Sequence, residues 1–321
     1  MDYFHLVLLE ASTMAPSVAL IIPTLNAERN LERLLPKISA QTVKPDQFIV
    51  VDSDSQDRTG ELLRQAGAVI VPISRAEFNH GGTRTAGLRL ASERDIAIFM
   101  TQDAIPVDEF AFERLLAPFQ DDEISVTYGR QTARLRAGPI EAFARQFNYP
   151  PTSQMRSATD IPRIGFKTCF CSNSFAAYRV RPLLDLGGFR SDVIFGEDTI
   201  AVAELILQGA KIGYVADAMV EHSHGYSMAE EFRRYFDIGV LHARERNLLE
   251  KFGSVGGAGR SFVTQELRFL LQVAPWLVPE AVARTLSKFV AYKLGGIERR
   301  LSVAAKRRLS MNGRYWRDVA L

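Results

Sequence analysis

Short apolar runs alternate with helical patterns between residues 18 and 100, and this alternation constrains the fold more than any other feature of the chain. The predicted strands are 18–22, 48–51, 68–71 and 96–100, and the predicted helices between them are 30–39, 58–66 and 83–92. Strands that alternate with helices form parallel sheets, so we predict an α/β fold with a Rossmann-like, mainly parallel sheet and helices on both faces. Ligands bind such sheets beyond the carboxyl ends of the strands.

The segment after the first strand argues against the common nucleotide-binding motifs. Pro23-Thr24-Leu25-Asn26-Ala27-Glu28 stands where a dinucleotide oxidoreductase carries Gly-x-Gly-x-x-Gly. A Walker-type phosphate loop is also absent from the sequence. A nucleotide must therefore be held in another way.

Beyond Thr101 the pattern becomes mixed, and after Tyr226 it is helical almost to the end. The expected elements are a helix at 107–119, a strand at 124–129, a mobile loop at 149–163, a strand and helix within 175–186, a helix from Gly196 to Gln208, and strands at 211–215 and 218–222. We predict an N-terminal extension at 1–16, an α/β domain at 17–226 and a basic, amphipathic helical region at 227–321.

The cysteines and the N-terminus favour a cytoplasmic protein. Cys169 and Cys171 are one residue apart, too close for an easy disulfide and too few for a structural zinc site. The apolar run from Phe4 to Leu9 is too short to span a bilayer and lacks the basic residues of a signal peptide.

Charge is distributed unevenly along the chain. The net charge is only +2, but residues 281–321 hold ten basic and two acidic side chains, a local net charge of +8. Such a tail suits an anionic surface, either lipid headgroups or nucleic acid, and a solvated helix face explains it equally well.

Phe78-Asn79-His80-Gly81-Gly82-Thr83-Arg84-Thr85 combines a glycine pair, a fixed positive charge and two hydroxyls before a predicted helix. Glycines let backbone N–H groups approach an anion, and arginine adds a bidentate donor at the positive end of the helix. The stretch suits a phosphorylated ligand, although a surface loop has the same composition.

Three further groups carry side chains able to do chemistry. Asp103 follows a strand, Glu197 and Asp198 open a helix, and His222 and His224 follow another strand. Taken singly, they are explained by a helix cap, by the helix dipole and by ordinary core or surface histidines. Taken together, they suit group transfer from a nucleotide diphosphate, in which Mg²⁺ or Mn²⁺ stabilises the leaving group and a carboxylate accepts the proton.

Over residues 17–245 the chain resembles the family 2 inverting glycosyltransferases, which have the GT-A fold, and within them the rhamnosyltransferases. The motifs that carry the resemblance are Pro23-Thr24-Leu25-Asn26, Val50-Val51-Asp52-Ser53-Asp54-Ser55, Gly82-Thr83-Arg84, Phe99-Met100-Thr101-Gln102-Asp103, Gly187-Gly188-Phe189 and Gly196-Glu197-Asp198. Phe78 to Arg84, Thr101 to Ala104 and His222 to Tyr226 resemble the rhamnosyl branch.

The resemblance implies roles for individual residues. Asp198 would be the catalytic base, with Glu197 beside it. Nucleotide-sugar contacts would come from Thr24, Asn26, Glu28, Asp52, Asp54, His80, Gly82, Arg84 and Gln102, with Arg84 near the diphosphate. Metal ligands would be Asp103, His222 and His224, and acceptor contacts Asn173, Glu197, Arg233 and Arg234. Thr101 stands where the family's first metal-binding aspartate usually lies, which places metal dependence in doubt.

The implied reaction is transfer of L-rhamnose from dTDP-L-rhamnose to a glycan or lipid-linked glycan in cell-surface polysaccharide synthesis, one sugar per encounter. The helical tail would contact the anionic inner leaflet peripherally, or form a bundle or a homodimer interface; no nucleic-acid partner is expected. Other readings are a UDP-hexose or UDP-N-acetylhexosamine donor, a nucleotidyltransferase, and a non-catalytic nucleotide-sugar binding protein.

Overall fold

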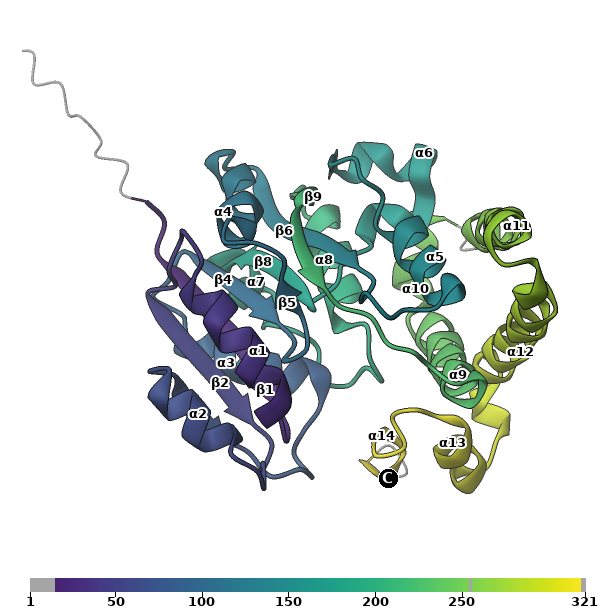
Figure 1. Ribbon diagram of the computed structural model, residues 1–321, viewed down its shortest axis with the longest axis horizontal. Coiled ribbons are helices and arrows are strands. Elements are labelled where there is room, and N and C mark those ends of the chain that lie inside the picture. The colour runs from purple at the N-terminus through teal and green to yellow at the C-terminus, as the bar shows by residue number, and fades with distance from the viewer. Residues whose placement is uncertain (1–14, 254–255, 319–321) are drawn as a thin grey trace, which may run out of the picture.

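The computed structural model describes residues 15–253 and 256–318, in which nine strands form one twisted sheet (Figure 1). Residues 1–14 of the predicted extension, including the apolar run at 4–9, lie outside the described residues. The strands are β1 Val18–Thr24, β2 Gln47–Asp52, β3 Val69–Pro72, β4 Ile96–Met100, β5 Ile105–Pro106, β6 Ile124–Thr132, β7 Gln154–Arg156, β8 Phe175–Arg179 and β9 Lys211–Glu221.

The first four strands form the parallel part of the sheet, in the order β3-β2-β1-β4. β1 and β4 are buried on both faces, as expected for strands covered by helices on each side. Alternate side chains of β1 enter separate cores: Ile21 packs with residues of α3 and α8, whereas Leu20 and Ile22 pack with α1 and α4. The predicted α/β fold with helices on both faces of the sheet is confirmed, and the carboxyl ends of β1, β2 and β4 lie at one edge.

The other half of the sheet is mixed. β8 lies antiparallel between β4 and β6, β9 is parallel to β6, and the short β5 and β7 pair antiparallel with β9. The mainly parallel arrangement therefore ends at β4. An apolar run does not reveal this change, because a buried strand has the same composition beside a parallel or an antiparallel neighbour.

The helices of the α/β part are α1 Glu28–Ser39, α2 Thr59–Gln65, α3 His80–Leu90, α4 Ala111–Leu116, α5 Pro139–Asn148, α6 Ile161–Ile164, α7 Val180–Asp185 and α8 Glu197–Leu207. Four predicted elements differ from the structure by more than small shifts of their ends. The helix expected at 83–92 begins at His80, and the helix expected at 107–119 shortens to α4 plus a 3₁₀ turn at Ala117–Gln120. The two strands expected at 211–222 form the single strand β9, which has a register shift, and the loop expected at 149–163 contains β7 and α6.

Helices continue from Ser227 through the rest of the described chain. They are α9 Met228–Arg244, α10 Arg246–Leu249, α11 Gly256–Val273, α12 Val278–Gly296, α13 Val303–Leu309 and α14 Tyr315–Asp318. α9 and α12 cross closely at glycines: a Cβ at Gly239 would lie 2.2 Å from the carbonyl oxygen of Tyr292, and one at Gly295 would lie 2.1 Å from that of Phe236. Two backbones can approach this closely only where side chains are missing.

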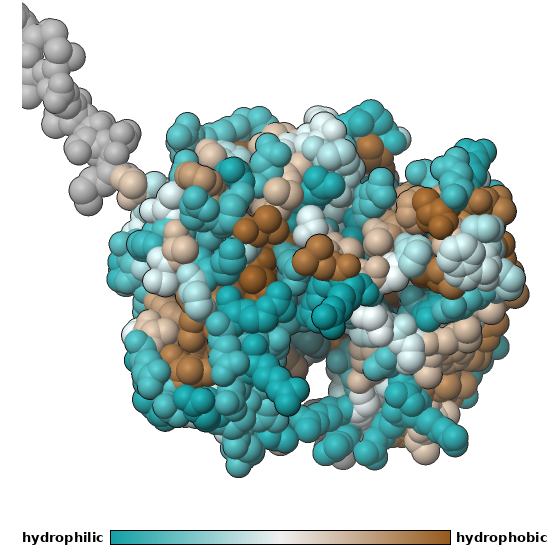
Figure 2. All heavy atoms as spheres, in the orientation of Figure 1, coloured by the Kyte–Doolittle hydropathy of each residue, from teal (hydrophilic) through white to brown (hydrophobic). Residues whose placement is uncertain are grey.

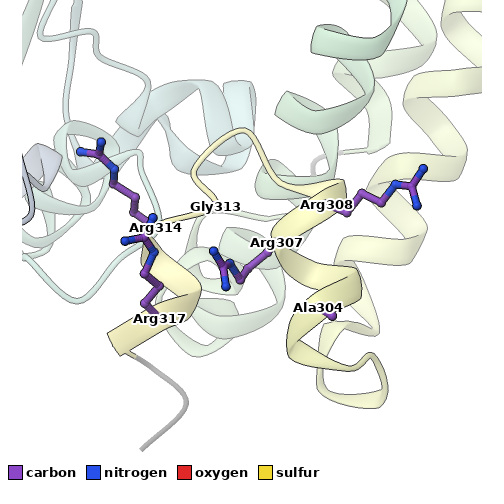
Figure 3. A pocket seen from close by; sticks show the side chains of 6 residues that line it. All are labelled: Ala304, Arg307, Arg308, Gly313, Arg314 and Arg317. Atoms are coloured by element: carbon purple, nitrogen blue, oxygen red, sulfur yellow. The ribbon is translucent and has the colours of Figure 1, made fainter.

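The last helices are fixed to this bundle. Trp316 is buried, with the cations of Arg244 and Lys306 over its ring at 5.2 and 4.9 Å. One carboxylate oxygen of Asp237 accepts hydrogen bonds from the backbone of Met311 and from the backbone and side chain of Asn312. Arginines of α13 and α14 project from this anchored backbone around a shared pocket (Figure 3).

Candidate active site

The nucleotide side of the candidate site is built at the ends of β1 and β2. Thr24 and Asp52 are register partners, and the Thr24 hydroxyl donates to Asp52 Oδ1 over 2.7 Å. The same carboxylate accepts from the N–H and hydroxyl of Ser55 at 3.0 and 2.6 Å. The Asn26 N–H donates to Ser55 Oγ over 2.8 Å, and Asn26 and Asp54 have φ of 46° and 62°. These loops are therefore held in a fixed, turned conformation at the sheet edge.

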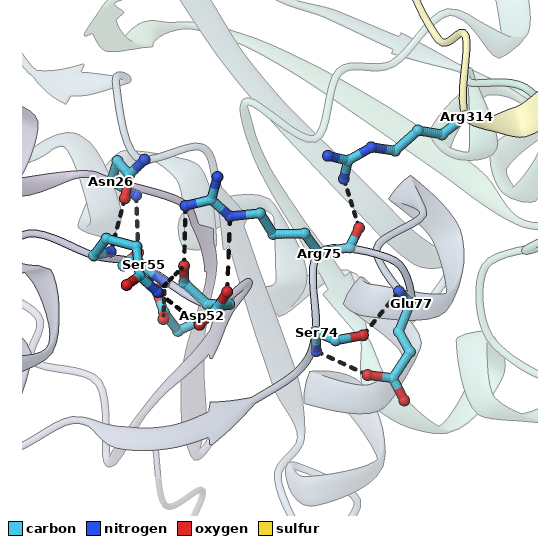
Figure 4. A network of polar contacts seen from close by, with 9 residues as sticks. Asn26, Asp52, Ser55, Ser74, Arg75, Glu77 and Arg314 are labelled. Carbon is cyan, nitrogen blue, oxygen red and sulfur yellow. Dashed lines mark hydrogen bonds and ion pairs between the residues drawn. The ribbon is translucent and has the colours of Figure 1, made fainter.

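Side chains from three further segments brace the same loops. Gln102 clamps the backbone of Leu25, accepting from its N–H at 2.8 Å and donating to its carbonyl at 3.2 Å. Glu28 accepts from the N–H of Arg58, at the start of α2. Arg75 lies 3.9 Å from the Asp54 carboxylate and donates to the Asp54 carbonyl, so it extends the network of Figure 4 toward the C-terminal helices.

The glycine-rich stretch forms the first turn of α3 rather than an open loop. Asn79 is the N-cap, and its side-chain oxygen accepts from the N–H of Gly82 over 2.6 Å. His80 is the first helical residue, and its carbonyl accepts from the guanidinium of Arg84. The cap occupies the N–H of Gly82, one of the donors that a phosphate would use, and phosphate binding by this stretch stays a prediction.

The glycine pair lets α3 approach the turn at 187–190. A Cβ at Gly81 would lie 1.9 Å from the carbonyl oxygen of Arg190, so the helix fits there only without a side chain. Four residues on, the Thr85 hydroxyl accepts from the N–H of Phe189 and donates to its carbonyl, at 2.9 and 3.1 Å. The motif therefore joins α3 to the segment that leads into α8.

Arg84 forms an ion pair with Glu197 at the start of α8. The two side chains meet at 2.9 Å and are almost completely buried. Burial acts to raise the pKa of Glu197, but the neighbouring guanidinium outweighs it and lowers that pKa. Arg84 is therefore the counter-ion of Glu197, and its contact with the diphosphate stays a prediction.

Asn173 supports both carboxylates from the loop before β8. Its backbone N–H donates to Asp198 Oδ2 at 3.0 Å, and its side-chain amide lies 3.4 Å from Glu197. Its side-chain oxygen accepts from the Tyr178 hydroxyl. Asn173 is buried and orients both carboxylates through these bonds, and its contact with the acceptor stays a prediction.

Asp198 is the more exposed of the two carboxylates and is poised as a base. Burial, followed by the negative charge of Glu197, raises the pKa of Asp198 to about 6, although the N–H groups of Asn173 and Thr199 act in the opposite direction. Desolvation and the adjacent carboxylate thus outweigh the field of the helix N-terminus, which would lower this pKa. A carboxyl with such a pKa is ionised at neutral pH and is a stronger base than an ordinary aspartate.

A second cluster brings together Asp103, His222 and His224, whose candidate ligand atoms lie within 4.8 Å of one another. The pairing of Ile105 with Glu221 explains the meeting, because Asp103 precedes β5 at the end of the ladder where β9 leads into His222. His222 Nε2 is 3.4 Å from one oxygen of Asp103, and His224 Nδ1 is 3.8 Å from the other. One carboxylate and two imidazoles are a suitable donor set for a divalent cation.

The surroundings of the cluster fit a metal site with modest affinity. His222 Nδ1 lies 3.0 Å from the side-chain oxygen of Gln131, which leaves Nε2 directed at Asp103. Burial and the neighbouring His222 lower the pKa of His224 to about 4, so its imidazole is neutral and able to ligate at neutral pH. The guanidinium of Arg134, 3.7 Å from Asp103, adds a positive charge that opposes cation binding.

Comparison with known proteins decides the family. The sequence model of glycosyl transferase family 2 matches residues 19–187, more than half of the chain. The chain belongs to glycosyl transferase family 2. It is therefore a glycosyltransferase, and the Glu197–Asp198 pair at the start of α8 lies ten residues beyond the matched segment.

Relatives similar to this transferase along nearly its whole length are known. The O-antigen chain rhamnosyltransferase RfbN of Salmonella typhimurium is 42% identical over 303 residues, 94% of this chain and 96% of the relative. The O-antigen chain rhamnosyltransferase WbaN of Salmonella anatum is 42% identical over 305 residues, 95% and 97% of the two chains. The mannosyltransferase PcManGT of Pyrobaculum calidifontis, solved with GDP-Man and Mn²⁺, has a TM-score of 0.53 at 18% identity over 96% of this chain and 87% of its own, which shows the shared fold.

Arg233 and Arg234, the predicted acceptor contacts of the transferase, lie exposed on α9. The guanidinium of Arg234 stands 5.7 Å from the ring of Phe195, directly before the Gly196-Glu197-Asp198 turn, and 5.9 Å from that of Tyr226. It therefore reaches the entrance to the carboxylate pair. Hydrophilic residues border a hollow between the α/β half and the C-terminal helices (Figure 2).

Sequence reasoning missed three residues of the transferase that surround the predicted metal ligands. Gln131 at the end of β6 also accepts from Arg145 of α5 at 2.7 Å, and Arg134 follows the same strand. No local motif marks Gln131 or Arg134, because β6 reaches the site only through its pairing with β9, and Arg145 joins them only because α5 packs nearby. Only the three-dimensional structure shows these long-range contacts.

Proposed function

We propose that the transferase moves L-rhamnose from dTDP-L-rhamnose to a hydroxyl of a lipid-linked glycan in O-antigen synthesis. Similarity to two O-antigen chain rhamnosyltransferases over at least 94% of the chain carries this proposal. The candidate site supports it, since it supplies a carboxylate base at the start of α8 and a cluster of possible cation ligands beside the β5–β9 pairing.

Asp198 would accept the proton of the attacking hydroxyl. The oxygen then forms a bond to the anomeric carbon from the face opposite the diphosphate, while the bond between that carbon and the diphosphate oxygen breaks and its electron pair leaves with the diphosphate. A β-linked donor thus yields an α-L-rhamnoside. Glu197, held ionised by Arg84, would keep the pKa of Asp198 high enough for proton transfer at neutral pH.

Asp103, His222 and His224 would hold Mg²⁺ or Mn²⁺ beside the donor diphosphate. A divalent cation in this position supplies Lewis-acid stabilisation of the negative charge on the leaving group. Gln131 would keep the His222 ring oriented, and Arg134 would place a further positive charge beside the phosphates. The buried network of Thr24, Asp52 and Ser55 would shape the pocket for base and ribose.

Donor turnover tests this proposal. The purified transferase is incubated with lipid-linked acceptors and with dTDP-L-rhamnose, a UDP-hexose or a UDP-N-acetylhexosamine, with Mn²⁺, Mg²⁺ or a chelator. We expect rhamnosyl product with the dTDP donor and an increase with divalent cation. Product formed only from a UDP-sugar would contradict the rhamnosyl assignment while leaving the transferase family intact.

We also propose that the transferase acts on the cytoplasmic side of the membrane and binds its anionic inner leaflet through α11 and α12. None of the helices in residues 15–253 and 256–318 is long and apolar enough to cross a membrane. Apolar side chains are exposed along this part of the chain: Leu271, Val273, Trp276, Val282, Leu286, Phe289 and Val290. With a basic tail nearby, they would suit peripheral binding.

Vesicle sedimentation tests this surface. Trp276→Ser with Phe289→Ser should reduce recovery with anionic vesicles, whereas Leu135→Ser, which removes a still more exposed apolar side chain from another region, should not. Equal recovery of both variants would contradict the membrane proposal. A change in sedimentation-equilibrium mass instead would show that the surface is a homodimer interface.

A further inference from the structure

Four arginines of the last two helices line one pocket, outside the candidate donor and metal residues. The pocket has a volume of about 500 Å³ and is lined by Ala304, Arg307, Arg308, Gly313, Arg314 and Arg317. In Figure 3, Arg307 extends from α13 toward α14, which carries Arg317 and directly follows Arg314, whereas Arg308 points away. No acidic residue is part of this lining.

The absence of acidic partners distinguishes these arginines from other basic residues of the same region. Arg284 and Lys288 pair with Glu231, and Lys306 pairs with Glu298 at 2.5 Å. Among the side chains that the structure describes, no carboxylate forms an ion pair with any of the four pocket arginines. Like charges gathered without a counter-charge repel one another, and a bound anion would remove this cost.

The backbone that carries the arginines is held in place on three sides. Trp316 is buried between two cations, and Asp237 accepts three hydrogen bonds from Met311 and Asn312. The Tyr315 hydroxyl donates to the carbonyl of Asp192 over 3.0 Å. The arginines are therefore presented by a fixed scaffold, which lowers the entropic cost of gathering them around a ligand.

One of the four arginines links the pocket to the nucleotide side. Arg314 Nη1 donates to the carbonyl of Arg75 at 2.6 Å, and Arg75 contacts Asp54 at the end of β2 (Figure 4). This bond crosses from the C-terminal helices to the α/β half. An anion in the pocket would therefore lie beside the donor half of the enzyme, separate from the Asp103 cluster.

We infer that this arginine pocket binds phosphate groups carried by a lipid. Planar guanidinium groups match phosphate oxygens in bidentate pairs, and several of them suit a group that carries several negative charges. The pocket stands on its own geometry and does not depend on the proposed rhamnosyl donor. Two sources share this chemistry: the diphosphate of a lipid-linked acceptor and the phosphate headgroups of the membrane.

Binding of inorganic pyrophosphate, measured by calorimetry in the presence of EDTA, tests the pocket. Arg307→Gln with Arg317→Gln removes two charges from it. Arg299→Gln with Arg300→Gln is the matched control, since it removes two exposed arginines from the neighbouring 3₁₀ turn. Arg314 is left intact because it bonds to Arg75.

We expect the pocket variant to bind pyrophosphate at least about tenfold more weakly, the effect of losing one charge-assisted contact, and the control to bind like the native protein. Equal affinities of the two variants, or no binding by the native protein, would overturn the inference. Unchanged near-ultraviolet circular dichroism would establish that both variants are folded. Because no turnover is measured, failure of the rhamnosyl proposal would leave this result unaffected.

Vesicle binding distinguishes the two sources of the phosphate groups, the headgroups of the membrane and the lipid-linked acceptor. Binding to phosphatidylglycerol vesicles that pyrophosphate reverses, and that the pocket variant loses, assigns the site to headgroups. Binding to phosphatidylcholine vesicles only when they carry a polyprenyl diphosphate assigns it to the lipid carrier of the acceptor. Binding to either vesicle that is equal in the pocket variant and the control would count against the pocket.

Discussion

The raised pKa of Asp198 predicts the acid side of the pH–rate profile. Its carboxyl has a pKa of about 6 because it is buried and adjoins the negative charge of Glu197. A general base must be ionised, so kcat/KM should fall as the pH drops through about 6. About nine-tenths of the enzyme would be active at pH 7 and about one-tenth at pH 5, a loss of roughly tenfold per pH unit below the pKa.

Glu197→Gln then shifts that profile in a definite direction. It removes the like charge that raises the pKa of Asp198, and the unpaired cation of Arg84 stabilises the ionised base further. We expect the acid limb to move down by about one pH unit, whatever the change in maximum rate. Glu204→Gln, on the same helix, is the control and should leave the limb near 6.

Initial rates of nucleoside diphosphate release at subsaturating donor, measured over about pH 4.5 to 8.5, give both profiles. A native acid limb near pH 4 would show that the base is an ordinary, solvated carboxylate. An unmoved limb in Glu197→Gln would show that the titrating group is not coupled to this neighbour. Either result would refute the roles assigned to the pair.

Three further perturbations have defined outcomes. Arg84→Met and Glu197→Gln should each lower the free energy of unfolding in urea by about 3–5 kcal/mol, since each leaves the other buried charge without its partner. The double variant should lose far less than the sum of the two single losses, and additive losses would contradict a buried ion pair. Gly81→Ala should lower the melting temperature strongly because its Cβ would overlap a carbonyl oxygen, whereas Gly60→Ala meets only a flexible side chain; equal effects would argue against the close approach of α3. Gln131→Ala should weaken Mn²⁺ binding about 10- to 100-fold, measured by electron paramagnetic resonance of the free ion, and unchanged affinity would exclude an orienting role.

The sequence predicts those parts of the site that depend on residues close together in the chain. Asp103 and His222 each follow a strand that ends at the same edge of the sheet, so both could be expected at that edge, but only the pairing of β5 with β9 brings them together. The opening of α8 by Glu197 and Asp198 could be read from the glycine before it. Such features depend on the chain near the residue concerned.

The parts that sequence does not predict depend on long-range pairing and burial. Arg84 and Glu197 are 113 positions apart, and only the close packing of α3 on the turn before α8 brings them together. That packing makes Arg84 the counter-ion of a buried carboxylate, a contact that the sequence does not reveal. The burial of Asn173 beside the same carboxylates is likewise visible only in the fold, where its side-chain oxygen accepts from the Tyr178 hydroxyl.

The bond between Arg314 and Arg75 also bears on how the enzyme matures. The donor half is synthesised first and can form its parallel sheet early, but Arg314, which braces its outer loop, follows Arg75 by 239 positions. This loop therefore gains its brace only after synthesis has passed Arg314 and the helices around it have docked.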